Sequence, residues 1–412
     1  MTVRLDPSDH PWMTADSLRP VLEALEAARP GGSRFVGGCV RNAILGDPVD
    51  DVDIATQLEP DAVTKALESA GLKAVPTGLE HGTITAVSGG AAFEITTLRK
   101  DVSTDGRRAV VAFTEDWDED SRRRDFRINA IYADFDGQVY DPQNGLKDAE
   151  NREIVFIGDA DDRIREDYLR ILRFFRFFAW YGSGRPDRDG LLACSRHKAQ
   201  METLSAERVW AELKKLLTAP DPGFALRWMW TVSILETLTG SKFGVDTASR
   251  LPALEQAQGW DIDPLLRFMA LLPPRVERAE TIAAKLKLSN AEKGRIMDWA
   301  RLSHGLQRGE GLGDEISEAD LSAALYRDGA QPFLDRAILA WADEPEQDLG
   351  DFVSRLKSWV RPEFPVSGKD LIAQGYEPGE ALGKELKSLE NKWIESGFSL
   401  DRAALLDQIR SA

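Results

Sequence analysis

Cysteine and histidine are scarce in this sequence, and neither forms a pattern. The two cysteines, Cys39 and Cys194, are far apart, and the four histidines do not cluster. Zinc sites need such ligands at close and characteristic spacings, so the sequence predicts no zinc site. We expect a protein of the reducing cytoplasm.

Basic residues are fewer than acidic residues. There are 52 lysines and arginines against 69 aspartates and glutamates, which gives a formal net charge of -17. This balance argues against a protein that coats nucleic acid nonspecifically. The arginines are nevertheless clustered, with four in residues 122–127 and five in residues 163–176. A nucleic-acid enzyme with a local basic cleft is therefore compatible with the acidic total.

Long apolar runs are absent. No run of about 18 apolar residues occurs, so we expect no membrane span. Residues 1–20 lack the basic start and apolar core of a secretory signal, so we expect none. The hydrophobic content of 42% and charged content of 29% are typical of a soluble globular protein, and 412 residues predict two to four domains.

The pattern of the chain changes along its length. Up to about residue 150, short alternating segments separated by glycines predict strands mixed with a few helices. The polar residues 101–108 predict a mobile loop, and residues 110–114 predict a further strand. From about Arg163 the strand signals fade and helical patterns follow one another. We therefore predict an α+β head followed by an elongated helical body.

Two aspartates follow a short apolar run. In an extended strand, residues i and i+2 point to the same face, so Asp51 and Asp53 should stand side by side. An arbitrary Asp-x-Asp is usually just a solvated strand edge or turn. Here Glu94 adds a third carboxylate on a later predicted strand, and carboxylates on adjacent strands can hold Mg²⁺. The combination favours a metal site.

A glycine pair precedes these carboxylates. Gly37 and Gly38 end an apolar run and open a helical pattern that carries Arg41. Glycine pairs usually only mark turns, but at a helix start they let backbone N–H groups approach a phosphate. Arg41 would add a charge-assisted contact. Together with the carboxylates, this motif predicts a site for a metal–nucleoside triphosphate.

A cluster of arginines follows in residues 122–129. Such a run is usually a solvated charge patch. Phe126 and Ile128 embed it in apolar context, however, so part of it should lie against a core. Arg124, Asp125 and Asn129 could then bind a ribose hydroxyl and a phosphate.

A second arginine row lies in residues 165–177. Asp167 and Arg170 are three residues apart, hence neighbours on one helix face, and Arg173 and Arg176 continue the row. A surface salt bridge is the plain interpretation. The surrounding leucines and phenylalanines make the helix mostly buried, though, and burying arginines without partners is costly. We therefore predict a cleft with an anionic ligand, in which the Asp–Arg pair could read a base edge.

Together these motifs resemble those of class II tRNA nucleotidyltransferases, the family of bacterial CCA-adding enzymes and bacterial poly(A) polymerase. The matching segments occur in the same order over nearly the whole chain. They are residues 37–41, 51–53, 94–99, 123–130, 141–148, 165–170, 204–208 and 367–371.

The resemblance implies a fold and its division. The fold would be a β-polymerase-like nucleotidyltransferase head with a mixed sheet, followed by an all-α neck, body and tail. We place the catalytic head at residues 1–150, the base-recognising neck at 151–220, the body at 221–345 and the tRNA-binding tail at 346–412.

The resemblance also implies an activity, which is template-independent addition of C, C and A to the 3′ end of tRNA from CTP and ATP with Mg²⁺. Asp51 and Asp53 would bind the metal, with Glu94 as a third catalytic carboxylate. Nucleotide contacts would come from Gly37, Gly38, Arg41, Arg124, Asp125 and Asn129. Asp167 and Arg170 would select C or A, and Arg173 and Arg176 would assist with phosphates.

Alternative activities stay open. They are poly(A) polymerase activity, partial CC-only or A-only addition, and a noncatalytic tRNA-binding protein that kept the fold. The acidic charge favours a compact tRNA held by shape and a local cleft. Neither a membrane nor a stable protein partner is implied.

The sequence departs from the family pattern at two positions. Asn42 stands where the family commonly has Asp, and Arg127 stands where Thr is usual. Residues 104–108 fall where the family has a flexible loop needed for the switch to A addition. No His-Asp dipeptide is present, so we expect no phosphohydrolase domain.

Overall fold

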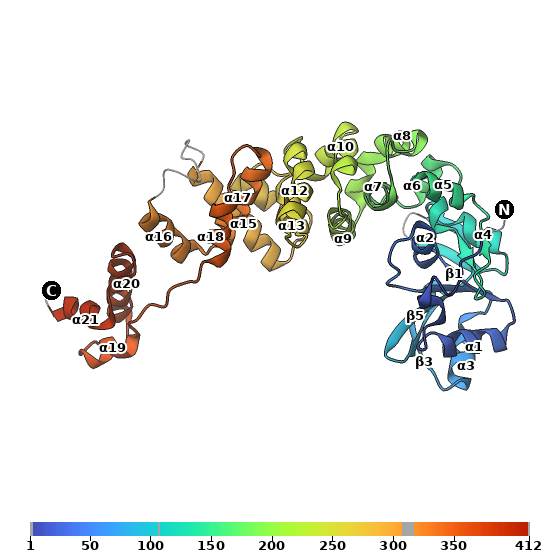
Figure 1. Cartoon of the computed structure of the whole chain (residues 1–412), viewed down its shortest axis with the longest axis horizontal. Helices are drawn as coiled ribbons and strands as arrows, with labels where there is room; N and C mark the ends of the chain where they lie inside the picture. Colours follow the sequence, from blue (N-terminus) through green and yellow to red (C-terminus); the bar gives the residue numbers. More distant parts are fainter. Residues whose placement is uncertain (1–2, 106–107, 307–316, 411–412) are drawn as a thin grey trace. The chain divides into compact units, whose positions relative to one another are not determined.

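The structure is a computed structural model that describes residues 3–105, 108–306 and 317–410 (Figure 1). The chain divides into two compact units, Met1–Gly240 and Ser241–Ala412. Each unit contains a hydrophobic core of its own. The finer boundaries at residues 150, 220 and 345 remain predictions.

The first unit is built on a seven-stranded sheet in the order β3-β4-β5-β2-β1-β8-β9. β2 and β5 run parallel and the other neighbouring strands antiparallel, so the sheet is mixed, as predicted. The strands are β1 (Ser33–Val36), β2 (Asp53–Thr56), β3 (Lys73–Gly78), β4 (Thr83–Ser88), β5 (Ala91–Thr97), β8 (Tyr132–Ala133) and β9 (Val139–Tyr140). The parallel pair matters most here, because its register sets Asp53 opposite Glu94.

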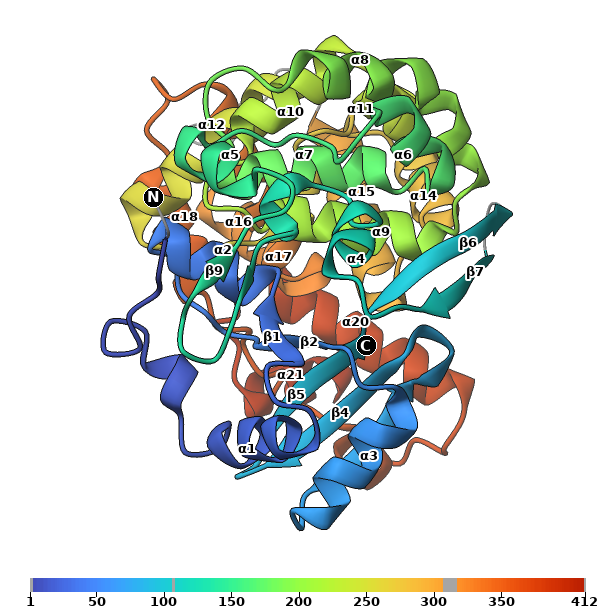
Figure 2. The same ribbon diagram turned by 90° about the vertical axis from the view of Figure 1, so that its right-hand side faces the viewer.

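Two helices, α1 (Arg19–Ala28) and α3 (Pro60–Ser69), pack against each other beside the sheet (Figure 2). Val21 and Leu25 of α1 and Val63 and Leu67 of α3 recur at helical spacing and are buried in one core with strand residues such as Phe35. Burial of each large apolar side chain contributes about 1.5–3 kcal/mol. This core therefore anchors the strands that carry the candidate site.

The predicted loop at residues 101–108 is mostly strand. β6 (Arg99–Asp105) and β7 (Arg108–Phe113) form a separate two-stranded antiparallel ribbon (Figure 2). The loop prediction was therefore wrong up to Asp105, because pairing with β7 supplies the backbone hydrogen bonds that the polar sequence did not predict. Arg108 begins β7, so the prediction was wrong there as well, and residues 106 and 107 lie outside the described residues.

Helices complete the first unit. They are α2 (Gly38–Leu45), α4 (Trp117–Arg122), α5 (Gly145–Asn151), α6 (Ala160–Glu166), α7 (Arg170–Tyr181), α8 (Arg188–His197), α9 (Ala206–Leu217), α10 (Gly223–Thr231) and α11 (Ile234–Thr239), with the 3-10 turn η3 at Arg127–Asn129. The row from Asp167 to Arg176 does not lie on one helix. Helix α6 ends at Glu166 and α7 begins only at Arg170, so Asp167 lies between them. Asp167 is extended, with φ −153°, and its carboxylate accepts the Leu169 N–H at 3.1 Å, a local bond that competes with helix formation.

A cluster of phenylalanines holds α7 against the arginine motif. Phe126 lies 4.7 Å from Phe156 and 5.2 Å from Phe177 between ring centroids. Phe156 in turn stacks on Phe174 at 5.5 Å. Phe126 and Phe174 are fully buried. The prediction that the arginine motif lies against a core is therefore confirmed, and this core brings the motif to α7.

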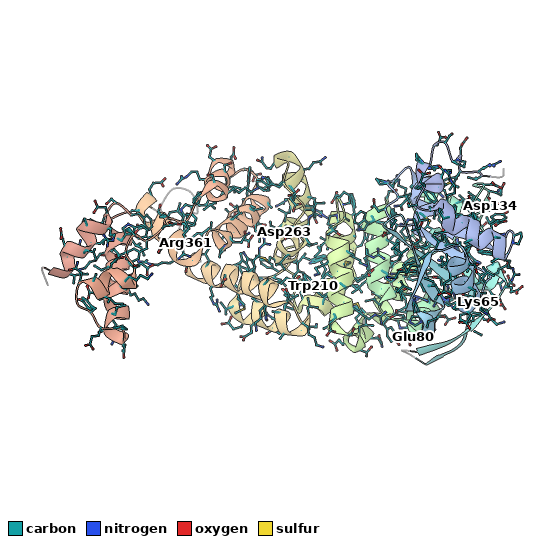
Figure 3. All side chains as sticks on the ribbon, turned by 90° about the horizontal axis from the view of Figure 1, so that it is seen from below. Lys65, Glu80, Asp134, Trp210, Asp263 and Arg361 are labelled. Atoms are coloured by element: carbon teal, nitrogen blue, oxygen red, sulfur yellow. The ribbon has the colours of Figure 1, made fainter. Side chains whose placement is uncertain are left out.

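The second unit is helical throughout its described residues. Its helices are α12 (Val245–Gln258), α13 (Pro264–Met269), α14 (Val276–Lys285), α15 (Asn290–Leu306), α16 (Glu318–Asp328), α17 (Gln331–Asp343), α18 (Gly350–Ser358), α19 (Gly368–Ala373), α20 (Glu380–Glu395) and α21 (Arg402–Arg410). Asp263, labelled in Figure 3, caps α13 and pairs with Arg295 at 2.6 Å. Arg295 also pairs with the fully buried Asp335. The predicted order, an α+β head followed by helices, is confirmed.

Among the described helices, none is long and apolar enough to cross a membrane.

Candidate active site

The glycine pair forms the turn that the sequence predicted. Gly37 precedes α2 with φ 72° and ψ −119°, a conformation that side chains strongly disfavour. A Cβ placed on it would lie 3.7 Å from Nη1 of Arg124 and 3.8 Å from the carbonyl oxygen of Asn129. The turn therefore lies directly against the arginine motif, with the N-terminus of α2 beginning at Gly38.

The carboxylates meet at the start of β2. Asp53 is the first residue of β2 and pairs in register with Glu94 of β5. Burial, and then the charge of Glu94, raise the pKa of Asp53 to about 6, with Asp51 adding to the effect and Arg124 opposing it. Asp51 is exposed and precedes the strand, so the prediction that both aspartates lie within one strand was wrong. β2 begins at Asp53 because its ladder with β5 begins with the pair Asp53 and Glu94.

These residues fit a divalent metal that arrives with its substrate. In the described part of the chain, no three His, Cys, Asp or Glu side chains are grouped closely enough to hold an ion by themselves. Mg²⁺ is commonly held by one or two carboxylates with substrate phosphates and waters. Asp51 and Asp53 are hard oxygen donors of this kind, and the charge of Glu94 acts on Asp53 in addition to its burial.

A cavity of about 500 Å³ lies between the glycine turn and helices α7 and α9. It is lined by Gly37, Gly38, Arg41, Asp53, Arg123, Arg124, Asp125, Asn129, Asp167, Leu169, Arg170, Arg173, Phe177 and Arg208. Most of the predicted residues thus meet in one place. The lining does not include Asp51, Glu94 or Arg176.

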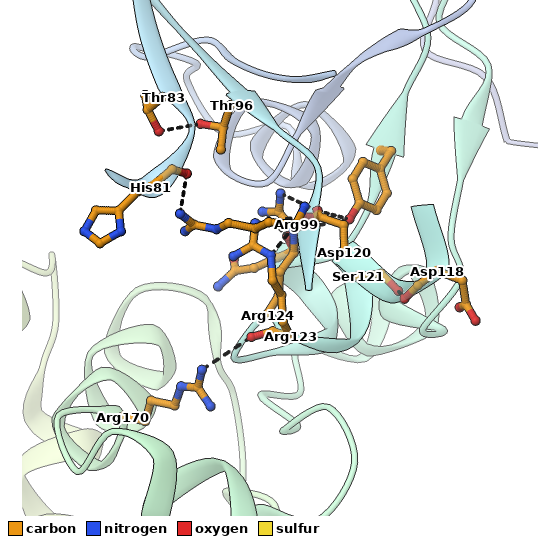
Figure 4. Close-up of polar contacts among 12 residues, drawn as sticks. His81, Thr83, Thr96, Arg99, Asp118, Asp120, Ser121, Arg123, Arg124 and Arg170 are labelled. Carbon is orange, nitrogen blue, oxygen red and sulfur yellow. Dashed lines mark hydrogen bonds and ion pairs between the residues drawn. The ribbon is translucent and has the colours of Figure 1, made fainter. Parts of the chain in front are cut away.

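Asp120, which our sequence reasoning missed, organises the arginine motif (Figure 4). Its carboxylate is buried and accepts hydrogen bonds from Arg123 Nε at 2.8 Å, Arg124 Nη2 at 3.2 Å and Tyr132 Oη at 2.8 Å. Burial by itself would raise the pKa of Asp120, but Arg124, Arg123 and the Tyr132 hydroxyl outweigh it and lower the pKa to about 2. Asp120 therefore stays ionised and fixes both guanidinium groups.

Asp125 and Asn129 are bonded to each other and to neighbouring groups. Asp125 accepts from the Phe126 N–H at 2.9 Å, from Asn129 Nδ2 at 3.0 Å and from Arg173 Nε at 2.8 Å. Burial would raise the pKa of Asp125, but Arg173 and Asn129 outweigh it and lower the pKa. Arg173 of α7 is thereby joined to the arginine motif.

The arginines of α7 all have carboxylate partners. Arg170 pairs with Glu166 at 2.5 Å, Arg173 with Asp125 at 2.5 Å, and Arg176 with Glu212 of α9. The prediction that this row is buried without partners was therefore wrong. Two of the partners come from segments 48 and 36 residues away, and a pattern read along one helix cannot show them.

Asp167 and Arg170 both line the cavity, but their side chains have different partners. Asp167 pairs with Arg208 of α9 at 2.6 Å. Arg170 donates to the carbonyl oxygens of Arg163 at 3.0 Å and of Arg123 at 3.4 Å (Figure 4). The predicted shared helix face was wrong because α6 ends before Asp167. Arg208 belongs to the matching segment at residues 204–208, but the sequence predicted no role for it.

Arg41 is buried at the inner end of the cavity. Its guanidinium donates to Asn129 Oδ1 at 2.6 Å, to Asn42 Oδ1 at 2.8 Å and to the Tyr181 hydroxyl at 2.7 Å. Burial lowers the pKa of Arg41 and nearby Arg176 adds to this, whereas Tyr181 and the charge of Asp125 oppose it. Tyr181, on the last turn of α7, carried no signal in the sequence that assigned it to the site.

The chain is similar to known proteins over most of its length. The Poly A polymerase head domain family matches residues 33–155, and the family described as the probable RNA and SrmB-binding site of polymerase A matches residues 187–239. CCA tRNA nucleotidyltransferase 1, mitochondrial, of Danio rerio is 33% identical over 379 residues, covering 91% of this chain and 86% of the relative. The CCA-adding enzyme of Streptococcus sanguinis is 33% identical over 402 residues, covering 94% of each chain.

Solved structures of CCA-adding enzymes have the same fold over nearly the whole chain. The Bacillus stearothermophilus CCA-adding enzyme in complex with CTP matches with a TM-score of 0.74 at 25% identity, over 96% of this chain and 98% of that chain. The Thermotoga maritima CCA-adding enzyme complexed with tRNA shares the fold, with a TM-score of 0.68 at 18% identity and coverage of 100% and 99%. The chain therefore belongs to the class II family that comprises the CCA-adding enzymes and the bacterial poly(A) polymerases.

Proposed function

We propose that this protein adds C, C and A to the 3′ end of tRNA, using CTP and ATP and releasing pyrophosphate. The observation that carries the proposal is the cavity where the glycine turn and Asp53 meet Asp167 and Arg170. One end of this cavity suits a triphosphate and the other suits a base. The names of the relatives that cover nearly the whole chain support the same activity.

The reaction is an in-line displacement. The 3′ hydroxyl of the RNA attacks the α-phosphate, the bond to the β-phosphate breaks, and pyrophosphate leaves. Mg²⁺ held by Asp51 and Asp53 would lower the pKa of the attacking hydroxyl and neutralise the triphosphate. Glu94 lies opposite Asp53 in the sheet and increases the negative charge at this point. The backbone N–H groups at the N-terminus of α2, after Gly37, would contact the phosphates.

Base choice is assigned to Asp167 and Arg170. Cytosine and adenine both present an amino group beside an unprotonated ring nitrogen on their pairing edge, whereas uracil and guanine present the reverse order. A carboxylate accepts from the amino group, and a guanidinium donates to the ring nitrogen. Arg124, Asp125 and Asn129 would contact the sugar and phosphates. Arg173 would support them through its bond to Asp125, whereas Arg176 pairs with Glu212 of α9.

Poly(A) tailing, or addition of CC or A alone, is the second candidate. Residues 33–155 match a poly A polymerase head domain family. This match supports the second candidate, because the chemistry of the head is the same for both activities. The net charge of -17 favours a compact tRNA over arbitrary RNA. The relatives include proteins named mitochondrial, so the cytoplasmic location stays a prediction.

The test is extension of tRNA transcripts that lack CCA, CA or A, resolved to single nucleotides, with CTP and ATP singly and together. We expect each transcript to be completed and extension to stop at the terminal A. Long A tails on unrelated RNA without C incorporation would refute the proposal in favour of poly(A) tailing.

A matched pair of variants tests the metal ligands. Asp53→Ala should abolish incorporation, whereas Asp61→Ala, which removes an exposed aspartate on α3, should retain it. Circular dichroism controls for folding. Full incorporation by a folded Asp53→Ala protein would overturn the assignment.

A further inference from the structure

The guanidinium of Arg41 lies beside the glycine turn. Arg41 belongs to the first turn of α2 and lines the cavity. A Cβ placed on Gly38 would lie 3.9 Å from Nη2 of Arg41, so this charge is next to the backbone N–H groups at the N-terminus of the helix. Outside α2, the guanidinium donates to Asn129 Oδ1 at 2.6 Å and to the Tyr181 hydroxyl at 2.7 Å. Its position therefore depends on segments far away in the sequence.

Tyr181 contacts this guanidinium with its ring as well as its hydroxyl. The Cζ atom of Arg41 lies 4.0 Å from the centroid of the Tyr181 ring. Phe177, one helical turn earlier on α7, stacks on Tyr181 with 5.9 Å between ring centroids and lies 5.4 Å from the same Cζ atom. A cation is attracted to the face of an aromatic ring, and more strongly where water is excluded. Arg41 is only 6% exposed, so these contacts restrict its guanidinium to one place.

Tyr181 acts on the cavity from outside. It is the last residue of α7 and does not belong to the cavity lining, whereas Arg170, the first residue of the same helix, does. Tyr181 therefore affects a ligand in the cavity through Arg41. One helix thus begins at the arginine assigned to base choice and ends against the arginine beside the glycine turn.

We propose that Tyr181 is a positioning residue of the triphosphate subsite, whose ring and hydroxyl hold the Arg41 guanidinium against the glycine turn. A free arginine side chain has many conformations, and ordering it when a ligand binds costs free energy. A guanidinium that is already held in place avoids this cost, so the triphosphate binds more tightly. The inference rests on the proposed function and assigns one further residue to its triphosphate subsite.

Two substitutions separate the ring from the hydroxyl. Tyr181→Phe removes the hydroxyl and keeps the ring, whereas Tyr181→Leu removes both. Binding of inorganic tripolyphosphate is measured by calorimetry at fixed Mg²⁺, and we expect its affinity to fall about threefold in Tyr181→Phe and about tenfold in Tyr181→Leu. The KM values of CTP and ATP on tRNA substrates should rise by the same factors. The preference for C or A should not change, because Asp167 and Arg170 are untouched.

Tyr140→Leu is the matched control. Tyr140 also packs its ring against an arginine, with Cζ of Arg34 at 3.7 Å from the ring centroid, and its hydroxyl donates to Asp134 at 3.1 Å. None of these three residues belongs to the cavity lining, so tripolyphosphate affinity should be unchanged in Tyr140→Leu. An equal loss in Tyr140→Leu and Tyr181→Leu would show a general effect on the fold and would overturn the proposal.

A double-mutant cycle shows whether Tyr181 acts through Arg41. Arg41→Gln should lower tripolyphosphate affinity, and Tyr181→Leu should cause no further loss in that background. Equal losses caused by Tyr181→Leu in both backgrounds would show that it acts independently of Arg41 and would overturn the proposal. Full affinity in Tyr181→Leu with Arg41 intact, or in Arg41→Gln, would overturn it as well.

Tyr181→Phe keeps the proposal testable if the leucine variant does not fold, because the same cycle can be built with it. Its threefold loss should disappear in the Arg41→Gln background, and a loss that persists there would overturn the proposal. Tripolyphosphate binding needs no turnover, so this result is separate from the proposed function, which fails only if the unmodified protein does not extend tRNA.

Discussion

At the scale of single residues, the site is organised by pairing between arginines and carboxylates. Asp125 and Asp167, which line the cavity, hold Arg173 and Arg208 in place, and the buried Asp120 holds Arg123. Fixed donors and acceptors do not have to be reoriented when a ligand binds, and this favours selective recognition.

Arg208→Ala should impair nucleotide choice. It removes the partner of Asp167, which lies 2.6 Å away, so that carboxylate would no longer be held for the base. We expect misincorporation of U or G to rise about tenfold with little change in tripolyphosphate affinity. Arg196→Ala is the matched control, because Arg196 is an equally exposed arginine that pairs with Asp161 outside this cavity. Unaltered fidelity in Arg208→Ala would contradict the assigned role of Asp167.

Asp120→Asn should destabilise the protein in a pH-dependent way. The pKa of Asp120 is lowered from 3.8 to about 2, so its contribution is fully present above the unfolded pKa and is lost as the pH falls through about 2. The shift corresponds to roughly 2 kcal/mol. Denaturant titrations of both proteins should show this difference at pH 7 and a narrowing gap below about pH 4. A gap that does not depend on pH would contradict the ionised state.

At the scale of elements, two short breaks shape the site. The Gly37 turn sets the direction of α2, and the extended Asp167 separates α6 from α7. Each break places a functional group at the end of an element, where its backbone or side chain can face the cavity.

Gly37→Ala should cost stability, because this residue combines φ 72° with ψ −119°. A Cβ there would make only ordinary van der Waals contacts, at 3.7 Å and 3.8 Å, so backbone strain of about 1–3 kcal/mol is the main cost. Gly383→Ala is the contrasting control, since Gly383 lies in α20 with open space around it. That change should stabilise the protein by about 0.5–1 kcal/mol. Urea unfolding measures the change in the free energy of unfolding for each variant. If both variants were stabilised or both destabilised, this interpretation would be refuted.

At the scale of the whole molecule, the chain forms two compact units, and the candidate cavity lies entirely within the first. The second unit has its own buried ion pairs, including Arg267 with Glu255 and Arg295 with Asp335. Damage to one of these pairs should therefore leave the cavity intact.

Asp335→Ala should destabilise the second unit alone. Asp335 is fully buried and bonded to Arg295 and Gln331, and removal of one partner of a buried pair costs about 3–5 kcal/mol. Calorimetric unfolding should show a transition shifted to lower temperature. Tripolyphosphate binding, measured below that transition, should be unchanged. Loss of binding in step with unfolding would show that the cavity depends on the second unit.

The local features of the site could be predicted because they depend on neighbours a few residues away. The glycine turn, the carboxylates near β2 and the change from a mixed sheet to helices follow from spacing and periodicity. The break at Asp167 could not be seen, because buried leucines and phenylalanines continue the helical pattern across it. The first strand of the ribbon, β6, was hidden by its polar composition, whereas the apolar β7 overlaps the strand predicted at residues 110–114.

The sequence by itself determined the order of the elements and the residue types at the site, since both are encoded in short stretches of chain. Only the tertiary structure decided which carboxylate meets which arginine. Arg173 meets Asp125 across 48 residues and Arg41 meets Asn129 across 88 residues. These pairings depend on how the phenylalanine cluster packs α7 against the arginine motif, and no local pattern carries that information.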